Sequence, residues 1–189
     1  MRIAVLASGS GTLLDAICAD GIPVALVVVD RNSLAIDIAR KHGVPVVLLE
    51  RESFGRDFDR VAYTERVVDV LQQHEIDLVV MAGWLTIFEK PMFEAYDSHI
   101  LNTHPALLPA FPGMNAYRQA LEYGVKVTGC TIHIATPAVD DGPILAQEPV
   151  RVYDDDTVNT LAERIKEVER QLYPQVIREF VDRGGPPEP

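Results

Sequence analysis

The chain has 189 residues, with 17 Lys and Arg against 28 Asp and Glu, and a net charge of −11. This negative charge argues against a protein whose main role is to bind nucleic-acid phosphates or an anionic membrane. No segment reaches the roughly 18 apolar residues that a membrane-spanning helix needs. The two cysteines, Cys18 and Cys130, are too few for a disulfide scaffold. We therefore expect a cytoplasmic protein with reduced thiols and with neither nucleic-acid nor membrane partners.

The first half of the chain alternates short, β-branched apolar runs with amphipathic stretches. The apolar runs are Ile3–Ala7, Val24–Val29, Val46–Leu49 and Leu78–Met81, and the amphipathic stretches are Leu13–Ala19, Leu34–His42 and about Arg60–His74. Continuous apolar runs are typical of strands that are covered on both faces. The order therefore predicts an α/β fold with a doubly wound, mostly parallel, Rossmann-like sheet.

The second half is more mixed. It predicts strands at His99–Thr103, Thr128–Ala135 and Ile144–Val152, a short helix at Ala116–Tyr123, and a long final helix with one apolar face from Val158 to Phe180. Asp155 or Asp156 is expected to cap this last helix. No linker separates the halves, so we expect a single domain over residues 1–183 and a flexible tail over residues 184–189.

A glycine-rich turn, Ser8 to Thr12, follows the first predicted strand and leads directly into a helix. Exposed N–H groups at a helix start suit a phosphate. The dinucleotide fingerprint is only partly matched, because Leu14 stands where a third glycine is expected, although Asp30 supplies the acid about 20 residues on. A phosphate site, a dinucleotide site and a purely structural turn all stay open at this point.

Asn102 and His104 lie at the end of a predicted strand, the edge where open α/β sheets bind ligands. Two residues apart, they point to the same side of an extended segment. An amide that holds an oxyanion beside an imidazole that moves protons is suited to acyl transfer. Asp140, in a loop between two later strands, is expected to stabilise the charged imidazole and fix its ring. The alternative is that these side chains only satisfy loop backbone.

Two other kinds of site receive little support. His99, His104, Asp140 and Asp141 show no known spacing of metal ligands. Ser8 and Ser10 lack the context of a nucleophile elbow, and neither cysteine has an electropositive setting. We therefore expect neither a bound metal nor a covalent nucleophile.

Several motifs together resemble one family. They are Asn102–Pro109, Asp140–Pro143, Ala7–Thr12, Ala82–Trp84, Ala110–Gly113, Arg118–Ala120, Gly124–Gly129 and Leu172–Pro174. In this order they resemble the formyltransferases that use 10-formyltetrahydrofolate, and within them the branch that acts on glycinamide ribonucleotide. The resemblance covers the whole chain except its tail.

The resemblance implies formyl transfer from 10-formyltetrahydrofolate to the amine of glycinamide ribonucleotide, with Asn102, His104 and Asp140 as catalytic residues. It implies that the acceptor substrate binds at Gly11, Thr12, Leu13, Lys166 and Glu169. It also implies that the folate binds at Arg56, Leu85, Thr86, Ile87, Phe88, Asn102, Thr136, Pro137, Ala138, Val139 and Asp140. No metal is implied, and a monomer or a homodimer is expected.

Some residues depart from the family's pattern. Leu13 stands where an Asn is frequent, Thr86 where some members have Arg, and Asn115 where some have His. The alternatives that remain are a formyltetrahydrofolate deformylase, a formyltransferase for another amine such as methionyl-tRNA or an amino sugar, and a nucleotide-binding module without catalysis. The deformylases usually have His-His where this chain has His104-Pro105, and a tRNA enzyme is expected to carry a basic extension.

Overall fold

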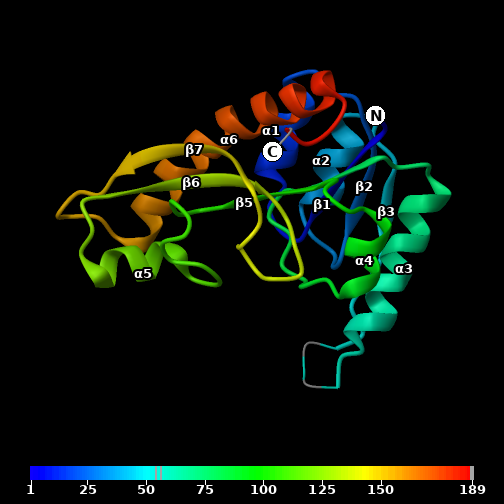
Figure 1. Ribbon diagram of the computed structural model, residues 1–189, viewed down its shortest axis with the longest axis horizontal. Coiled ribbons are helices and arrows are strands. Elements are labelled where there is room, and N and C mark those ends of the chain that lie inside the picture. Colours follow the sequence, from blue (N-terminus) through cyan, green and yellow to red (C-terminus); the bar gives the residue numbers. More distant parts are fainter. Residues whose placement is uncertain (54, 56, 188–189) are drawn as a thin grey trace.

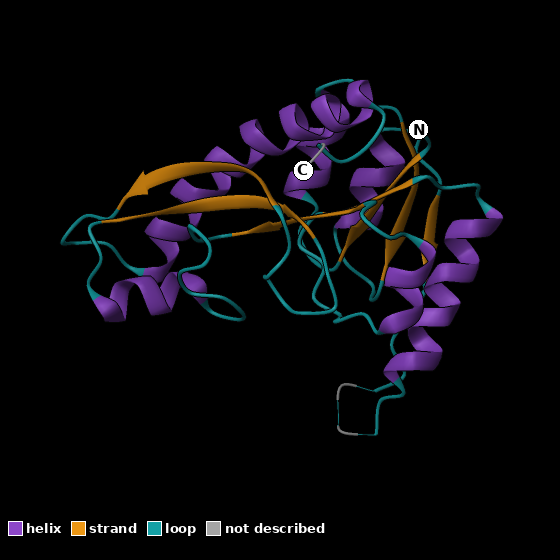
Figure 2. Ribbon diagram, in the orientation of Figure 1, coloured by secondary structure: helices purple, strands orange, loops and turns teal. Residues whose placement is uncertain are grey.

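A seven-stranded sheet forms the centre of the computed structural model, which describes residues 1–53, 55 and 57–187 (Figures 1 and 2). The strand order is β3-β2-β1-β4-β5-β6-β7. The strands are β1 (Ile3–Ala7), β2 (Val24–Val29), β3 (Val46–Leu48), β4 (Leu78–Met81), β5 (Ile100–His104), β6 (Val127–Ile134) and β7 (Ile144–Arg151). Strands β1 to β5 run parallel to one another. Strand β6 runs antiparallel to β5, and β7 runs antiparallel to β6. The predicted α/β, mostly parallel sheet is confirmed.

Helices cover both faces of the sheet. They are α1 (Thr12–Ala19), α2 (Ala35–Lys41), α3 (Arg60–Gln73), α4 (Lys90–Ala95), α5 (Ala116–Tyr123) and α6 (Val158–Arg183). One core joins β1 and β2 to α1, α2 and α6, and a second joins the opposite face to α3 and α4. A third lies between α5, β6, β7 and α6. Figure 1 shows α6 running along one side of the molecule and α3 with α4 on the other.

Three details differ from the sequence predictions. The short helix α4 was not predicted, because its six residues are too few to show a helical period. Strand β5 ends at His104 rather than at Thr103, so His104 belongs to the strand. The cap of α6 is Thr157, whose hydroxyl accepts from Thr160 N–H in a capping box; the prediction of Asp155 or Asp156 as the cap was wrong.

The first two residues of the predicted tail follow α6 directly and close its C-terminal end. Gly184 N–H donates to Val181 O and Gly185 N–H donates to Phe180 O, which closes the last turn. The single domain over residues 1–183 and the flexible tail over residues 184–189 stay predictions. Within the described part of the chain, none of the helices has the length and apolar character needed to cross a bilayer.

Candidate active site

The main pocket lies at the carboxyl ends of β1, β4 and β5 and encloses about 580 Å³. Strand β1 lies between β2 and β4, so the chain order of the sheet reverses there. Such a switch point is where open α/β sheets bind ligands. The predicted site residues that line this pocket are Gly11, Thr12, Leu13, Leu85, Thr86, Ile87, Phe88, Asn102, His104, Thr136, Pro137, Val139, Asp140, Lys166 and Glu169.

Two predicted folate-binding positions are not among them. Ala138 does not line the pocket, although its carbonyl accepts a hydrogen bond from Thr136 Oγ1 at 3.0 Å. It therefore contributes to the shape of the 136–140 loop rather than to the pocket wall. Arg56 lies outside the described residues, so its assignment stays a prediction.

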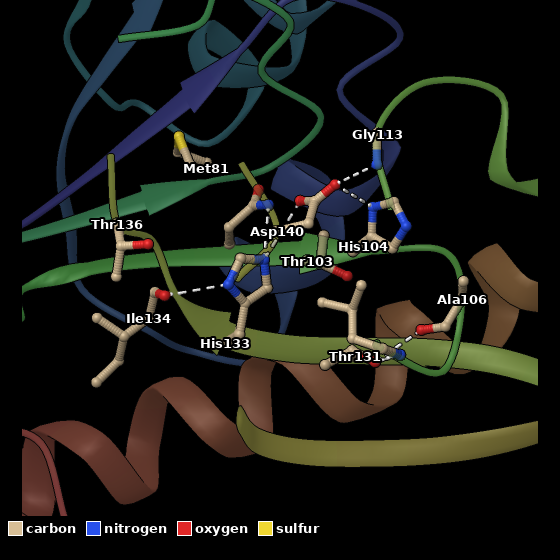
Figure 3. A network of polar contacts seen from close by, with 12 residues as sticks. Met81, Thr103, His104, Ala106, Gly113, Thr131, His133, Ile134, Thr136 and Asp140 are labelled. Atoms are coloured by element: carbon tan, nitrogen blue, oxygen red, sulfur yellow. Dashed lines mark hydrogen bonds and ion pairs between the residues drawn. The ribbon is translucent and has the colours of Figure 1, made fainter. Parts of the chain in front are cut away.

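His104 and Asp140 form a buried pair, with side chains 6% and 8% exposed. His104 Nδ1 lies 3.1 Å from Asp140 Oδ2 (Figure 3). His104 Nε2 lies 2.7 Å from the carbonyl oxygen of Phe111. An ionised carboxylate and a carbonyl can only accept, so both ring nitrogens must donate if both contacts are hydrogen bonds. The Phe111 carbonyl therefore accepts from Nε2–H, and the Asp140 carboxylate lies against Nδ1.

Asp140 is held in place from several directions. Its backbone adopts the left-handed conformation, with φ at 56°. Its Oδ2 also accepts from Gly113 N–H at 2.7 Å, while Oδ1 lies 3.6 Å from His133 Nε2. Burial acts to raise the pKa of Asp140, but the contacts with His133 and Gly113 and the charge of His104 outweigh it and lower the pKa. The residue is therefore a carboxylate at neutral pH.

Asn102 reaches a partner that the sequence analysis did not name. The register of β5 and β6 sets Asn102 directly opposite His133, and Asn102 Nδ2 lies 3.1 Å from His133 Nε2. His133 is buried, and Figure 3 shows Asp140 lying between the two imidazoles. Alternation over β6 places His133 on the same side as Thr131, but the sequence does not indicate which strand pairs with β6. For this reason His133 was missed.

The other end of the pocket is formed by the glycine turn and α6. Gly11 adopts φ 71°, and a Cβ there would lie 2.8 Å from Ala35 Cα, so the turn needs glycine. The first helical N–H groups of α1, at Thr12 and Leu13, have no hydrogen bond within the described residues and are available to an anion. Lys166 lines this end, with its Nζ 2.9 Å from Glu163 Oε1.

Apolar side chains surround the mouth of the pocket. Met114 is 82% exposed and Leu85 is 64% exposed, with Ile87 and Val139 also at the surface. Beneath them, Trp84 and Phe88 stack with ring centroids 5.5 Å apart. Apolar walls with few polar groups are typical of a site for a flat organic ligand.

Asp30 is not available to bind the ribose of a dinucleotide, because protein groups occupy its carboxylate. It is fully buried, both of its oxygens accept from Arg31, and Thr86 Oγ1 donates to Oδ2 at 2.8 Å. Burial acts to raise its pKa, but the bonds from Arg31, Thr86 and Ser8 lower it overall. Asp30 is therefore a structural carboxylate that holds the segment after β4.

The candidate nucleophiles and metal ligands give no competing centre. Ser8 is buried and its Oγ accepts from Leu85 N–H, while burial raises the pKa of the Cys130 thiol to about 12. Among the described residues, no group of three or more His, Cys, Asp or Glu side chains is arranged to hold a metal ion.

Comparisons with known proteins show the family to which the chain belongs. The formyl transferase family matches residues 1–177. Phosphoribosylglycinamide formyltransferase of Mycobacterium tuberculosis is 43% identical over 97% of this chain and 86% of its own length. The Bacillus subtilis protein of the same name is 34% identical over 95% of this chain and 94% of its own length.

Solved structures give the same result. Glycinamide ribonucleotide transformylase 1 from Symbiobacterium toebii superposes with a TM-score of 0.89 and 44% identity, covering 97% of this chain and 88% of that one. Phosphoribosylglycinamide formyltransferase from Bacillus halodurans gives a TM-score of 0.88 at 38% identity, covering 97% of both chains. From its sequence, its fold and its relatives, the chain belongs to the formyl transferase family.

Proposed function

We propose that this chain transfers the formyl group of 10-formyltetrahydrofolate to the amine of glycinamide ribonucleotide, a step of de novo purine synthesis. The observation that carries the proposal is the convergence of Asn102, His104 and Asp140 in one pocket. The names of the relatives and structural neighbours support the choice of acceptor. The partners proposed are small molecules.

Asn102 and His104 act on the developing oxyanion. The acceptor amine attacks the formyl carbon, and the formyl oxygen becomes negatively charged. Asn102 Nδ2 carries two hydrogens, and it can donate one of them to this oxygen. His104 Nε2–H, which here donates to the Phe111 carbonyl, would exchange that neutral acceptor for the charged oxygen, which is the stronger acceptor.

Asp140 supports the charge of His104 and the movement of the proton. In the overall reaction a carbon–nitrogen bond forms to the acceptor amine, and the bond from the formyl carbon to the folate N10 breaks. One proton leaves the amine and one is gained by the departing N10, so that tetrahydrofolate is released. The Asp140 carboxylate beside the imidazole would offset positive charge on the ring while His104 donates to the oxyanion.

The two ends of the pocket suit the two substrates. The N–H groups of Gly11, Thr12 and Leu13, with Lys166, would hold the acceptor's phosphate, and Glu169 would contact its sugar. The walls Leu85–Phe88 and the 136–140 loop would enclose the folate, with Arg56 completing that site. Thr86, whose hydroxyl donates to Asp30, would contribute only its methyl and backbone.

The proposal is tested by following loss of the formyl group from 10-formyltetrahydrofolate by absorbance. The purified protein is assayed with glycinamide ribonucleotide, with an amino sugar phosphate, with methionyl-tRNA and without acceptor. We expect turnover that requires glycinamide ribonucleotide. Turnover without acceptor would identify a deformylase, and turnover only with another amine would replace the proposed acceptor.

A further inference from the structure

The end of β5 presents side chains to both halves of the pocket. His104 points to one side of the strand, toward Asp140, and Thr103 points to the other side (Figure 3). Asn102, two residues before His104 on the same strand, shares the side of His104. On that side lies α6, and Thr103 Oγ1 donates to Glu169 Oε1 at 2.8 Å. Thr103 and Glu169 both line the pocket. The sequence analysis gave Thr103 no role.

Glu169 is unusually buried for a carboxylate, with 7% of the residue exposed. Its Oε1 accepts from Thr103, and within the described residues its Oε2 makes no hydrogen bond. The groups that influence it are Lys166 and Arg170 on the same helix, Tyr173 one turn further on, Tyr117 of α5 and Cys130 of β6. Because Oε2 is not one of the enclosed polar atoms that lack a partner among the described residues, it is accessible from the pocket, where a ligand can supply a donor.

We propose that Thr103 is a positioning residue whose hydroxyl fixes the Glu169 carboxylate so that Oε2 accepts a hydrogen bond from a sugar hydroxyl of the acceptor substrate. The inference rests on the proposed function and adds a residue to it. A carboxylate would repel the phosphate of the same substrate, so it must face the hydroxyl-bearing part. The phosphate then lies toward the glycine turn and Lys166.

The hydrogen bond from Thr103 also opposes protonation of the Glu169 carboxylate. Burial raises the pKa of Glu169, while the Thr103 bond and the charges of Lys166 and Arg170 oppose this rise. A protonated carboxyl group would be a poorer partner for a hydroxyl donor at a fixed geometry. Removing the Thr103 hydroxyl therefore removes the contact that orients the Glu169 carboxylate and one of the groups that oppose its protonation.

The test compares Thr103→Val, Thr103→Ser and Glu169→Gln with the parent protein. Thr103→Val keeps the shape and removes the hydroxyl, and we expect a rise of about tenfold in KM for glycinamide ribonucleotide. The kcat and the KM for the folate should change less than about twofold. Thr103→Ser restores the hydroxyl and should restore KM, and Glu169→Gln should raise the same KM as Thr103→Val or more.

The matched control is Thr128→Val. Thr128 is also a buried threonine on a strand, but it does not line the pocket, and its hydroxyl has no hydrogen-bond partner among the residues that the structure describes. It should leave both KM values unchanged. An unchanged acceptor KM in Thr103→Val, a fall confined to kcat, or no rescue by Thr103→Ser would overturn the positioning role.

A binding measurement separates this inference from the proposed function. Titration calorimetry with ribose 5-phosphate and with inorganic phosphate needs no formyl transfer. We expect Thr103→Val to weaken ribose 5-phosphate about tenfold and to leave phosphate unaffected. If the parent protein fails to formylate glycinamide ribonucleotide but this pattern holds, the acceptor assignment fails and the role of Thr103 stands. Equal weakening of both ligands, or of neither, would overturn the role itself.

Discussion

At the scale of single residues, the geometry of the site depends on the Asp140 carboxylate, which several groups contact at once. One carboxylate contacts His104 through Oδ2, approaches His133 through Oδ1 and accepts from Gly113 N–H. The spacing of Asn102 and His104, and the resemblance that pointed to Asp140, were enough to predict three members of this cluster. His133 could not be predicted, because its place depends on the register between β5 and β6.

Replacing Asp140 tests whether its charge is needed. Asp140→Asn keeps the shape of the side chain but removes the charge opposite His104, so we expect kcat to fall by a factor of about 10² or more. Steady-state kinetics measure this, with Asp141→Asn, an exposed neighbour, as the matched control. An Asp140→Asn enzyme with parental kcat would show that the pair only holds the loop.

Replacing His133 tests whether it acts through Asn102. We expect His133→Gln to lower kcat by about tenfold, since the Asn102 amide loses its neighbour at 3.1 Å. In the Asn102→Ala background the same change should cost little more, because residues that act as a unit are not additive. Additive losses in the double variant would mean that His133 acts independently of Asn102.

At the scale of elements, apolar runs predicted the strands well, but details at their ends depended on tertiary contacts. His104 ends β5 because it pairs with Thr131 of β6. At the start of α6, Asp156 is not the cap but a second support for it. Its carboxylate accepts from Thr160 Oγ1 at 2.8 Å and from Arg164 at 2.7 and 2.8 Å. Composition alone could not distinguish Asp156 from Thr157 in these roles.

The contribution of the start of α6 to protein stability should therefore depend on Asp156. Its side chain is 3% exposed, and Asp156→Asn removes the charge that Arg164 contacts. We expect the free energy of unfolding to fall by about 2 kcal/mol. Urea denaturation measures this, and Asp155→Asn, at an exposed position, should change it by less than about 0.5 kcal/mol. Equal effects of the two variants would contradict the account of this helix start.

At the scale of the whole molecule, the parallel part of the sheet builds the switch point and the antiparallel part completes the site. Strand β6 brings His133 beside Asn102, and the segment between β6 and β7 brings Asp140 to His104. The alternating first half predicted the parallel strands, since each apolar run is short and followed by a helix. The order of the last strands needed the structure, because hairpin pairing at that edge leaves little trace in composition.

The stability of the whole chain should depend on pH through these carboxylates. For Asp156 the bonds from Arg164 lower the pKa, and for Asp140 the contacts with His133 and Gly113 do so against the effect of burial. A group with a lowered folded-state pKa stabilises the protein above its unfolded value, about 3.9, and this contribution is lost as pH falls further. We expect the free energy of unfolding to decrease from about pH 5 downward, and less steeply in Asp156→Asn. If the free energy of unfolding of Asp156→Asn fell with pH as steeply as that of the parent protein, Asp156 would not be a source of the pH dependence.

The central claim is that Asn102, His104 and Asp140, in one pocket, catalyse formyl transfer from 10-formyltetrahydrofolate to glycinamide ribonucleotide. The most direct measurement is mass spectrometry of the acceptor after incubation with a folate whose formyl carbon is isotopically labelled, using the parent protein and His104→Ala. The account predicts labelled N-formyl product with the parent protein and a rate lower by a factor of about 10² to 10³ in His104→Ala. Label that is released as formate, or product formed at equal rates by both proteins, would contradict it.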